Sequence, residues 1–291
     1  MFRKIRCDLH SLVANHRSAT QKDANDYVTH YFRPHLARAG QKPTLNIQDL
    51  GAVHGESLTE AYVFQDLCIE KIEELNDPLV GWRVQGISDA SRRRLISREL
   101  YCGPIMNSMT KNLQLHKKAL SQGIPSMKRD KLLDLEVQLA FQVEDGDIPD
   151  IVSSTEIADY LGAMYLVVEL TACRMPWRPR DVPTHITDFS GGGYVILSDP
   201  IPKQTWISKD LANQAAVIMR NSSPVGIGKT SKITGTPLSA IKYLHKHLKT
   251  RGRDLQDKIV CTGCMGAVSL EPGHYTAMFG TLGSVDSIVE P

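Results

Sequence analysis

A single glutamate lies inside a strongly apolar stretch of the sequence. Glu169 interrupts the run 164–170, where an unpaired buried charge would be costly. Such a carboxylate needs a positive partner, and the sequence is compatible with two kinds. One is an arginine, such as Arg174 a few positions later, and the other is a divalent metal ion. Because its ligands would be oxygens, a metal at this position is predicted to be Mg²⁺ or Mn²⁺ rather than zinc.

A second polar pair occurs within residues 132–143, which alternate in the way expected of a β-strand. Side chains at positions i and i+2 of a strand share a face, so Glu136 and Gln138 are predicted to point the same way. The residues between them are apolar and are predicted to face the core. A carboxylate and an amide on one strand face are compatible with plain exposure to solvent or with a functional site.

Two cysteines form a C-x-x-C pair, Cys261 and Cys264. A zinc site would require a second pair of ligands, and a redox site would require a strand-to-helix context. The sequence shows neither, so the favoured interpretation is two packed thiols at the end of a strand.

The elements that position these residues follow from caps and periodicity. Ser57 to Glu60 forms an S-x-x-E pattern typical of a helix start, and residues 153–156 repeat it. Helices are predicted within 8–40, from 57 to about 72, after 153, and over 239–251. Strands are predicted over 79–84, 132–143 and in short glycine-punctuated segments after 191. This order lacks a regular βαβ rhythm, which indicates an α+β or mostly β fold rather than a Rossmann sheet.

The composition narrows the class of protein. The chain has 291 residues, 42% of them hydrophobic, and a net charge of +2. A large single domain, or a main domain with a smaller appendage, is expected. The charge balance predicts no nucleic-acid partner, and the absence of a long apolar run predicts no membrane partner. Six scattered cysteines and no recognisable signal peptide predict reduced thiols and a cytoplasmic location.

An ordered set of motifs resembles the fumarylacetoacetate hydrolase superfamily, specifically its branch of 2-oxopent-4-enoate hydratases and 4-oxalocrotonate decarboxylases. No single motif is specific, but their order along the chain is. The motifs are Ala61-Tyr62 with Gln65, Gly81-Trp82-Arg83-Val84, Gly103–Met109, Glu136–Phe141, Glu169–Arg174, Thr187-Asp188, Gly235-Thr236-Pro237 with Ala240, Tyr243 and Leu244, Ile259–Gly263, and Gly280–Gly283.

The resemblance implies a mixed β-roll or barrel with a helical N-terminal region, residues 1–85 with the first strand, followed by a catalytic domain over 86–291. It implies a lyase, of hydratase or decarboxylase type, in which Mg²⁺ or Mn²⁺ stabilises the enolate of a small 2-oxo acid or its dienol. It also implies assembly into a homo-oligomer. The implied metal ligands are Glu136, Gln138 and Glu169; the implied catalytic residues are Arg83, Asp188 and Cys264; and the implied substrate-binding residues are Asn107, Phe189 and Arg174.

Several of these positions depart together from the family pattern. Gln138 stands where the family has an acidic ligand, which removes one negative charge from the metal site. Arg83 stands where the family has a lysine, and an arginine can hold an anion but cannot act as a general base. Three interpretations therefore stay open. They are a metal-dependent lyase, a repurposed enzyme that cyclises or isomerises a larger biosynthetic intermediate without metal, and a non-catalytic homologue.

Overall fold

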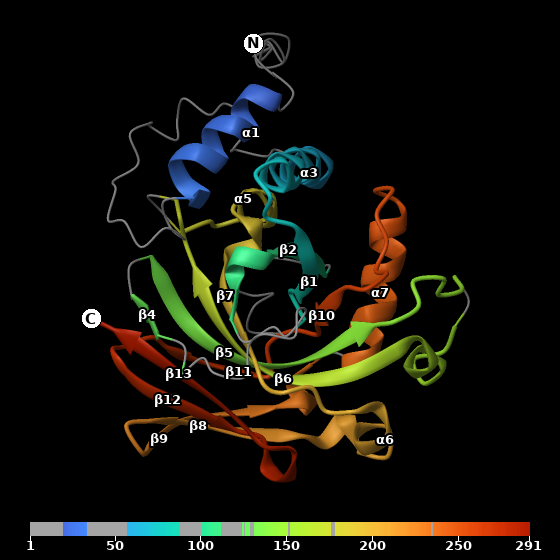
Figure 1. Ribbon diagram of the computed structural model, residues 1–291, viewed down its shortest axis with the longest axis vertical. Helices are drawn as coiled ribbons and strands as arrows, with labels where there is room; N and C mark the ends of the chain where they lie inside the picture. The colour runs from blue at the N-terminus through green and yellow to red at the C-terminus, as the bar shows by residue number, and fades with distance from the viewer. Residues whose placement is uncertain are drawn as a thin grey trace, which may run out of the picture.

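A computed structural model describes residues 20–33, 57–87, 100–111, 124, 126–128, 131–150, 152–175, 178–233 and 235–291. An eight-stranded mixed sheet forms the larger part of the described fold (Figure 1). Its order is β2-β1-β10-β5-β6-β7-β3, with β11 paired to β5. These strands are β1 (Leu79–Gln85), β2 (Tyr101–Met106), β3 (Thr110–Lys111), β5 (Leu132–Val143), β6 (Leu161–Ala172), β7 (Gly192–Leu197), β10 (Ile259–Cys261) and β11 (Gly266–Ser269).

The connection between β2 and β3 explains why this sheet curls. The two strands stand at opposite ends of the sheet order, yet only a short 3₁₀-helix, η3 (Asn107–Met109), separates them in sequence. The sheet therefore bends until its two ends approach each other, and it forms the half-barrel seen in Figure 1. Side chains of strands that are far apart in the sheet order can consequently meet across its interior.

A second, five-stranded sheet packs below the half-barrel (Figure 1). Its order is β4-β13-β12-β8-β9, and its β9 contacts β11 of the larger sheet. Glycines allow close approach there, because a Cβ on Gly226 would overlap Val268. The strands are β4 (Ser126–Lys128), β8 (Ala215–Arg220), β9 (Ser223–Lys229), β12 (Gly273–Met278) and β13 (Ser284–Glu290).

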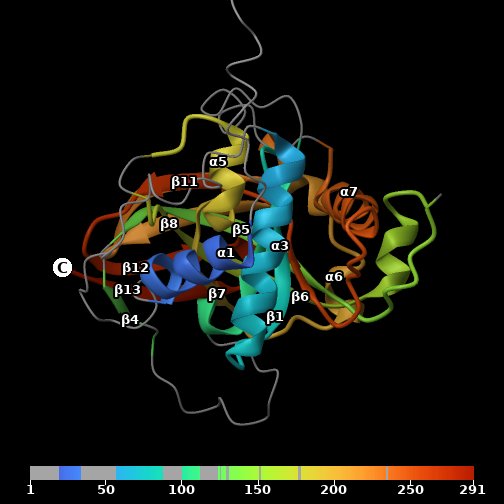
Figure 2. The same ribbon diagram turned by 90° about the horizontal axis from the view of Figure 1, so that it is seen from above.

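Helices cover the other end of the half-barrel. Figure 2 shows α1 and α3 crossing over the strands next to α5. The Ser57 side chain caps α3 by accepting a hydrogen bond from the backbone of Glu60, and the apolar face of α3 is buried. Within the described residues no helix has the length and apolar character needed to cross a membrane. The helices are α1 (Gln21–Tyr27), its π-helical continuation η1 (Val28–Phe32), α3 (Leu58–Glu74), α5 (Val182–Thr187), α6 (Lys203–Trp206) and α7 (Pro237–Lys249).

The expected α+β class is confirmed, and the mixed β-roll or barrel implied by the resemblance is present as this half-barrel. The predicted strands at 79–84 and 132–143 are β1 and β5. The helix predicted after residue 153 is only a five-residue 3₁₀-helix, Glu156–Tyr160, because the apolar residues that follow it form the central strand β6. Residues 8–19 and 34–40 of the first predicted helix lie outside the described residues. The boundary between residues 85 and 86 stays a prediction.

A half-buried histidine on α7, His247, makes the stability of this fold dependent on pH. The His247 ring lies against the rings of Tyr62 and Tyr243, with centroid distances of 4.5 and 5.8 Å. Burial, together with the nearby Arg251 charge, lowers the pKa of His247 to about 4. The unfolded chain holds this proton with an ordinary pKa of about 6.5. The stability contributed by neutral His247 is therefore fully present above about pH 6.5 and is lost as the pH falls towards about 4.

We expect the free energy of unfolding to decrease by about 1 to 2 kcal/mol over this interval because of His247, a value reduced for its partial exposure. Urea denaturation of the wild type and of His247→Gln, at several pH values between 4 and 7, measures this contribution. The variant should show the shallower dependence on pH. Equal slopes would show that His247 does not titrate as its surroundings predict.

Candidate functional site

The partner of the buried Glu169 is an arginine from the far side of the half-barrel. Arg83 lies on β1 and Glu169 on β6, with β10 and β5 between them in the sheet order. The two side chains meet across the interior, where Arg83 Nη1 donates to Glu169 Oε1. Both are fully buried, and the second guanidinium nitrogen, Nη2, donates to the carbonyl oxygen of Phe189. Arg174, the partner considered from the sequence, is engaged elsewhere.

The side-chain amide of Gln138 donates a hydrogen bond to the second oxygen of the same carboxylate. Its Nε2 donates to Glu169 Oε2 at 2.6 Å and to Glu136 Oε2 at 3.2 Å, while its Oε1 accepts from the backbone N–H of Gly263 at 3.2 Å. This orientation follows from the partners, because carboxylates only accept and a backbone N–H only donates. The amide therefore presents its donor side, not its oxygen, to the two carboxylates.

The three predicted metal ligands are brought together, but their arrangement does not fit a divalent cation. One oxygen of Glu169 accepts from Arg83 and the other accepts from Gln138, whose amide oxygen points away. Among the described residues, no group of three or more His, Cys, Asp or Glu side chains is placed to hold a metal ion. A cation here would also lie next to the permanent charge of Arg83.

Cys264 lies beside this group as a neutral thiol. Burial, followed by the charges of Glu136 and Glu169, raises the pKa of Cys264 well above its ordinary value. Its side chain is hydrogen-bonded to Glu136. Because only a thiolate is a strong nucleophile, these surroundings favour a hydrogen-bonding role over nucleophilic catalysis.

A second buried ion pair involves Asp188 and Arg174. The backbone N–H of Arg174 donates to Asp188 Oδ2 at 2.9 Å, and Arg174 Nη1 lies 3.3 Å from Asp188 Oδ1. The hydroxyl of Tyr27, from the N-terminal helix α1, donates to Asp188 Oδ1 at 2.6 Å. The rings of Tyr27 and Phe32 also pack edge-on against Phe189. Helix α1 and its continuation η1 therefore pack against Asp188 and Phe189.

Replacing Tyr27 with phenylalanine should decrease the free energy of unfolding by about 1 to 3 kcal/mol, because Asp188 loses a buried hydrogen bond to its charged form. Thermal or urea denaturation measures this change. Tyr165→Phe is the matched control, since the Tyr165 hydroxyl has no hydrogen bond within the described structure. Equal stabilities of the two variants would show that the Tyr27–Asp188 contact contributes nothing.

The backbone after Asp188 is strained. Phe189, Ser190 and Gly191 have φ values of +51°, +53° and +73°, a left-handed conformation that costs energy at the first two positions. Several contacts hold it in place. Arg83 donates to the Phe189 carbonyl oxygen, and Ser190 Oγ donates to the carbonyl oxygen of Cys102 at 2.7 Å. Strain of this kind is typical of functional sites, where the surrounding structure fixes the conformation.

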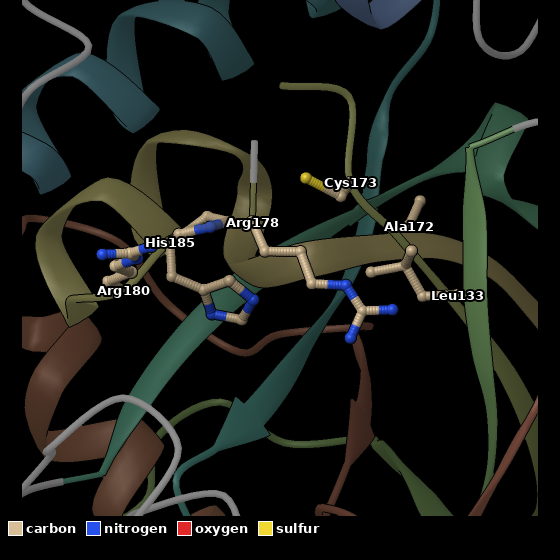
Figure 3. Close-up of a pocket in the computed structure, with 7 residues that line it drawn as sticks. Leu133, Ala172, Cys173, Arg178, Arg180 and His185 are labelled. Carbon is tan, nitrogen blue, oxygen red and sulfur yellow. The ribbon is translucent and has the colours of Figure 1, made fainter. Parts of the chain in front are cut away.

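A pocket of about 530 Å³ is lined by residues of β5, β6, α5 and the loop before α5 (Figure 3). Its floor is apolar, and its rim includes two exposed arginines, Arg178 and Arg180. Neither arginine forms an ion pair or a hydrogen bond within the described part of the chain. None of the described residues that line the pocket is acidic, so the two arginines give this lining a positive charge. The lining residues are Leu133, Ala172, Cys173, Arg178, Pro179, Arg180 and His185.

Gly191 and Gly192 lie between the pocket residue His185 and the buried guanidinium of Arg83. A Cβ on Gly191 would contact the His185 ring, and a Cβ on the next residue, Gly192, would overlap the guanidinium of Arg83. His185 is therefore the lining residue that connects the pocket to the interior. Burial and then the Asp188 charge raise the pKa of Cys173 to about 11, so the cysteine on the pocket floor is also a neutral thiol.

Not every predicted site residue joins these groups. Asn107 is exposed at the end of β2 opposite to the part near Arg83, and its backbone N–H donates to Pro78 at 2.9 Å. Arg178, Arg180 and His185 are residues that the sequence reasoning missed. Their signal was the pair of arginines around Pro179, directly before the capped start of α5 at Asp181.

Comparison with known proteins gives weak sequence similarity. No protein-family model matches the chain. Two curated 2-keto-4-pentenoate hydratases, one from Paraburkholderia xenovorans and one from Pseudomonas putida, are each 29% identical to it over 99 residues. The aligned region covers 33% of this chain and 36% of each relative, so the chain matches about a third of their length.

Solved structures match most of the chain. A 4-oxalocrotonate decarboxylase from Pseudomonas putida G7, complexed with magnesium and adipate, has a TM-score of 0.76 at 17% identity, covering 94% of this chain and 100% of the other. A fumarylpyruvate hydrolase from Pseudomonas aeruginosa, complexed with Mn²⁺ and pyruvate, scores 0.50 at 14% identity, covering 74% and 91%. A fumarylacetoacetate hydrolase family protein from yeast scores 0.51 at 16% identity, covering 72% and 92%.

These similar proteins are named as enzymes, among them hydratases, a decarboxylase and a hydrolase, and two of the solved structures contain a divalent metal. At these identities the likeness establishes the fold and leaves the individual reaction open. The chain has the fold of the fumarylacetoacetate hydrolase superfamily, and the resemblance predicted from its motifs is confirmed.

Proposed function

We propose that this protein is a lyase-type enzyme that binds a small 2-oxo acid or its dienol in the pocket beside Arg178 and Arg180. The observation that carries the proposal is a pair of guanidinium groups beside an apolar pocket that have no partner among the residues the structure describes. Guanidinium groups form strong, charge-assisted hydrogen bonds with carboxylates. The substrate's carbon chain would lie on the floor formed by Leu133, Ala172 and Cys173.

The similar proteins support this choice of substrate class. Two relatives are named as hydratases of 2-keto-4-pentenoate, and the solved structures hold adipate and pyruvate, both of which are carboxylates. The cytoplasmic location and the homo-oligomer expected from the sequence stay predictions.

The chemistry requires stabilisation of negative charge on an enolate oxygen and the movement of a proton. Arg178 and Arg180 can hold the carboxylate and place positive charge near the enolate. His185, which lines the pocket, can move a proton to or from the substrate, because an imidazole both donates and accepts protons. The pairing of Glu169 with Arg83 favours a route without resident metal over the metal-dependent route, both of which the sequence left open.

Turnover of a 2-hydroxydienoate, followed by the loss of its ultraviolet absorbance, tests the proposal. We expect activity in the presence of EDTA, and we expect His185→Asn to reduce kcat more than it changes KM. Retention of full activity by His185→Asn would remove this residue from the reaction. Failure of the wild type to bind pyruvate or to turn over a dienoate would contradict the proposed function.

A larger, more apolar substrate that is cyclised or isomerised is a second candidate. The pocket volume of about 530 Å³ supports it, because sites for drug-sized molecules fall within roughly 300–1,000 Å³. A substrate with an extended apolar tail should then bind more tightly than pyruvate, whereas a site for a five-carbon acid should exclude it.

A further inference from the structure

We infer that the guanidinium of Arg83 acts as the permanent counter-charge of Glu169, in the place of a divalent cation. The fold then needs no metal ion to balance this buried carboxylate. The proposal concerns the buried cluster of Arg83, Gln138 and Glu169, which we call the core triad. It does not depend on which substrate occupies the pocket.

The first argument is that both oxygens of the Glu169 carboxylate already accept buried hydrogen bonds. A metal ligand needs an oxygen lone pair that faces the ion. Here one oxygen faces Arg83 Nη1 and the other faces Gln138 Nε2 at 2.6 Å. Both donors come from fully buried side chains, so solvent does not compete for these bonds. A metal ion at either oxygen would have to share that oxygen with one of these donors.

The second argument is that the chain makes room for the guanidinium. A Cβ on Gly192 or on Gly103 would overlap the Arg83 side chain. These two glycines lie on β7 and β2, on either side of the interior, and Gly192 has an ordinary φ of −72°. The lack of a side chain at Gly192 is thus explained by the space that the arginine needs rather than by backbone conformation, whereas at Gly103 the Phe189 carbonyl oxygen and the guanidinium both limit the space.

The third argument is charge. Arg83 stays protonated at every physiological pH, so its charge cannot be removed to admit a cation. Gln138 adds no negative charge and turns its amide donor to both carboxylates. Two carboxylates, Glu136 and Glu169, therefore face one fixed positive charge. The guanidinium would repel a divalent ion at short range, so it offsets part of the attraction of the two carboxylates for such an ion.

Thermal denaturation with EDTA, Mg²⁺ or Mn²⁺ tests the inference on the wild-type protein. We expect the melting temperature to change by less than about 1 °C under all three conditions, and Mn²⁺ to show no stoichiometric binding by calorimetry or electron paramagnetic resonance. Binding of one Mn²⁺ per chain, with a raised melting temperature and loss of both effects in Glu169→Gln, would overturn the inference.

A double variant, Arg83→Met with Gln138→Glu, provides the complementary test. It removes the guanidinium and provides three carboxylates, so Mn²⁺ at a hundredfold excess over its Kd should raise its melting temperature by about 5 °C or more. The matched controls are the two single variants, each of which lacks one of the two changes. If the double variant does not fold, the wild-type titration still decides the question. Pocket binding of pyruvate is measured separately, so failure of the proposed function is distinguishable from failure of this inference.

Discussion

Replacing Arg83 with methionine should decrease the free energy of unfolding by about 3 to 5 kcal/mol. The reason is that Glu169 would keep its charge in a fully buried position with only the Gln138 amide as a partner. Methionine fills a similar volume, so little of the effect would come from a cavity. Urea denaturation at pH 7 measures the change as a lower midpoint with an unchanged slope.

The matched control for this prediction is Arg220→Met. Arg220 pairs with Glu271 at the surface, where both side chains are partly exposed, so its loss should cost less than about 1 kcal/mol. A further variant, Arg83→Met with Glu169→Leu, should recover much of the lost stability, because it removes the unpaired charge. An Arg83→Met protein that is as stable as Arg220→Met would contradict the charge-pair account of the interior.

Removing both pocket arginines, with Arg178→Gln and Arg180→Gln, should weaken the binding of a 2-oxo acid by roughly a hundredfold. Each hydrogen bond to a charged group is worth about 1.5 to 3 kcal/mol, and each 1.4 kcal/mol corresponds to about a tenfold change in affinity. Both side chains are exposed and unpaired, so the fold should stay intact. Isothermal titration with pyruvate measures the affinity, and the melting temperature confirms the fold.

A second pair of substitutions controls for overall charge in this experiment. Lys209→Gln with Lys229→Gln also removes two positive charges, from exposed residues outside the pocket. This variant should bind pyruvate with nearly wild-type affinity. Equal losses in the two double variants would show that long-range electrostatic attraction, rather than contact in the pocket, explains the binding.

The sequence predicted the strands of this site better than its contacts. The alternation in 132–143 placed Glu136 and Gln138 on one face, and the Gln138 amide does donate to both Glu136 and Glu169. The apolar surroundings of Glu169 also indicated correctly that it is buried and needs a positive partner. These are local properties, because they depend on the period of a strand and on the cost of burying a charge.

The identity of that partner could not be predicted locally. Arg174 is close to Glu169 in sequence, but it pairs with Asp188, whereas Arg83 reaches Glu169 only because the sheet curls. The sheet curls because the link between β2 and β3 is short and β3 pairs with β7. Neither of the two paired segments reveals this pairing by itself. The pocket was missed for the same reason, since its lining comes from β5, β6, α5 and the loop before α5.

The most direct test of the central claim is calorimetric titration of pyruvate into EDTA-treated wild-type protein and into the Arg178→Gln, Arg180→Gln variant. The account predicts one binding site per chain in the wild type without added metal, and loss of that binding in the variant. Binding that requires Mg²⁺ or Mn²⁺ and that persists in the variant would contradict it.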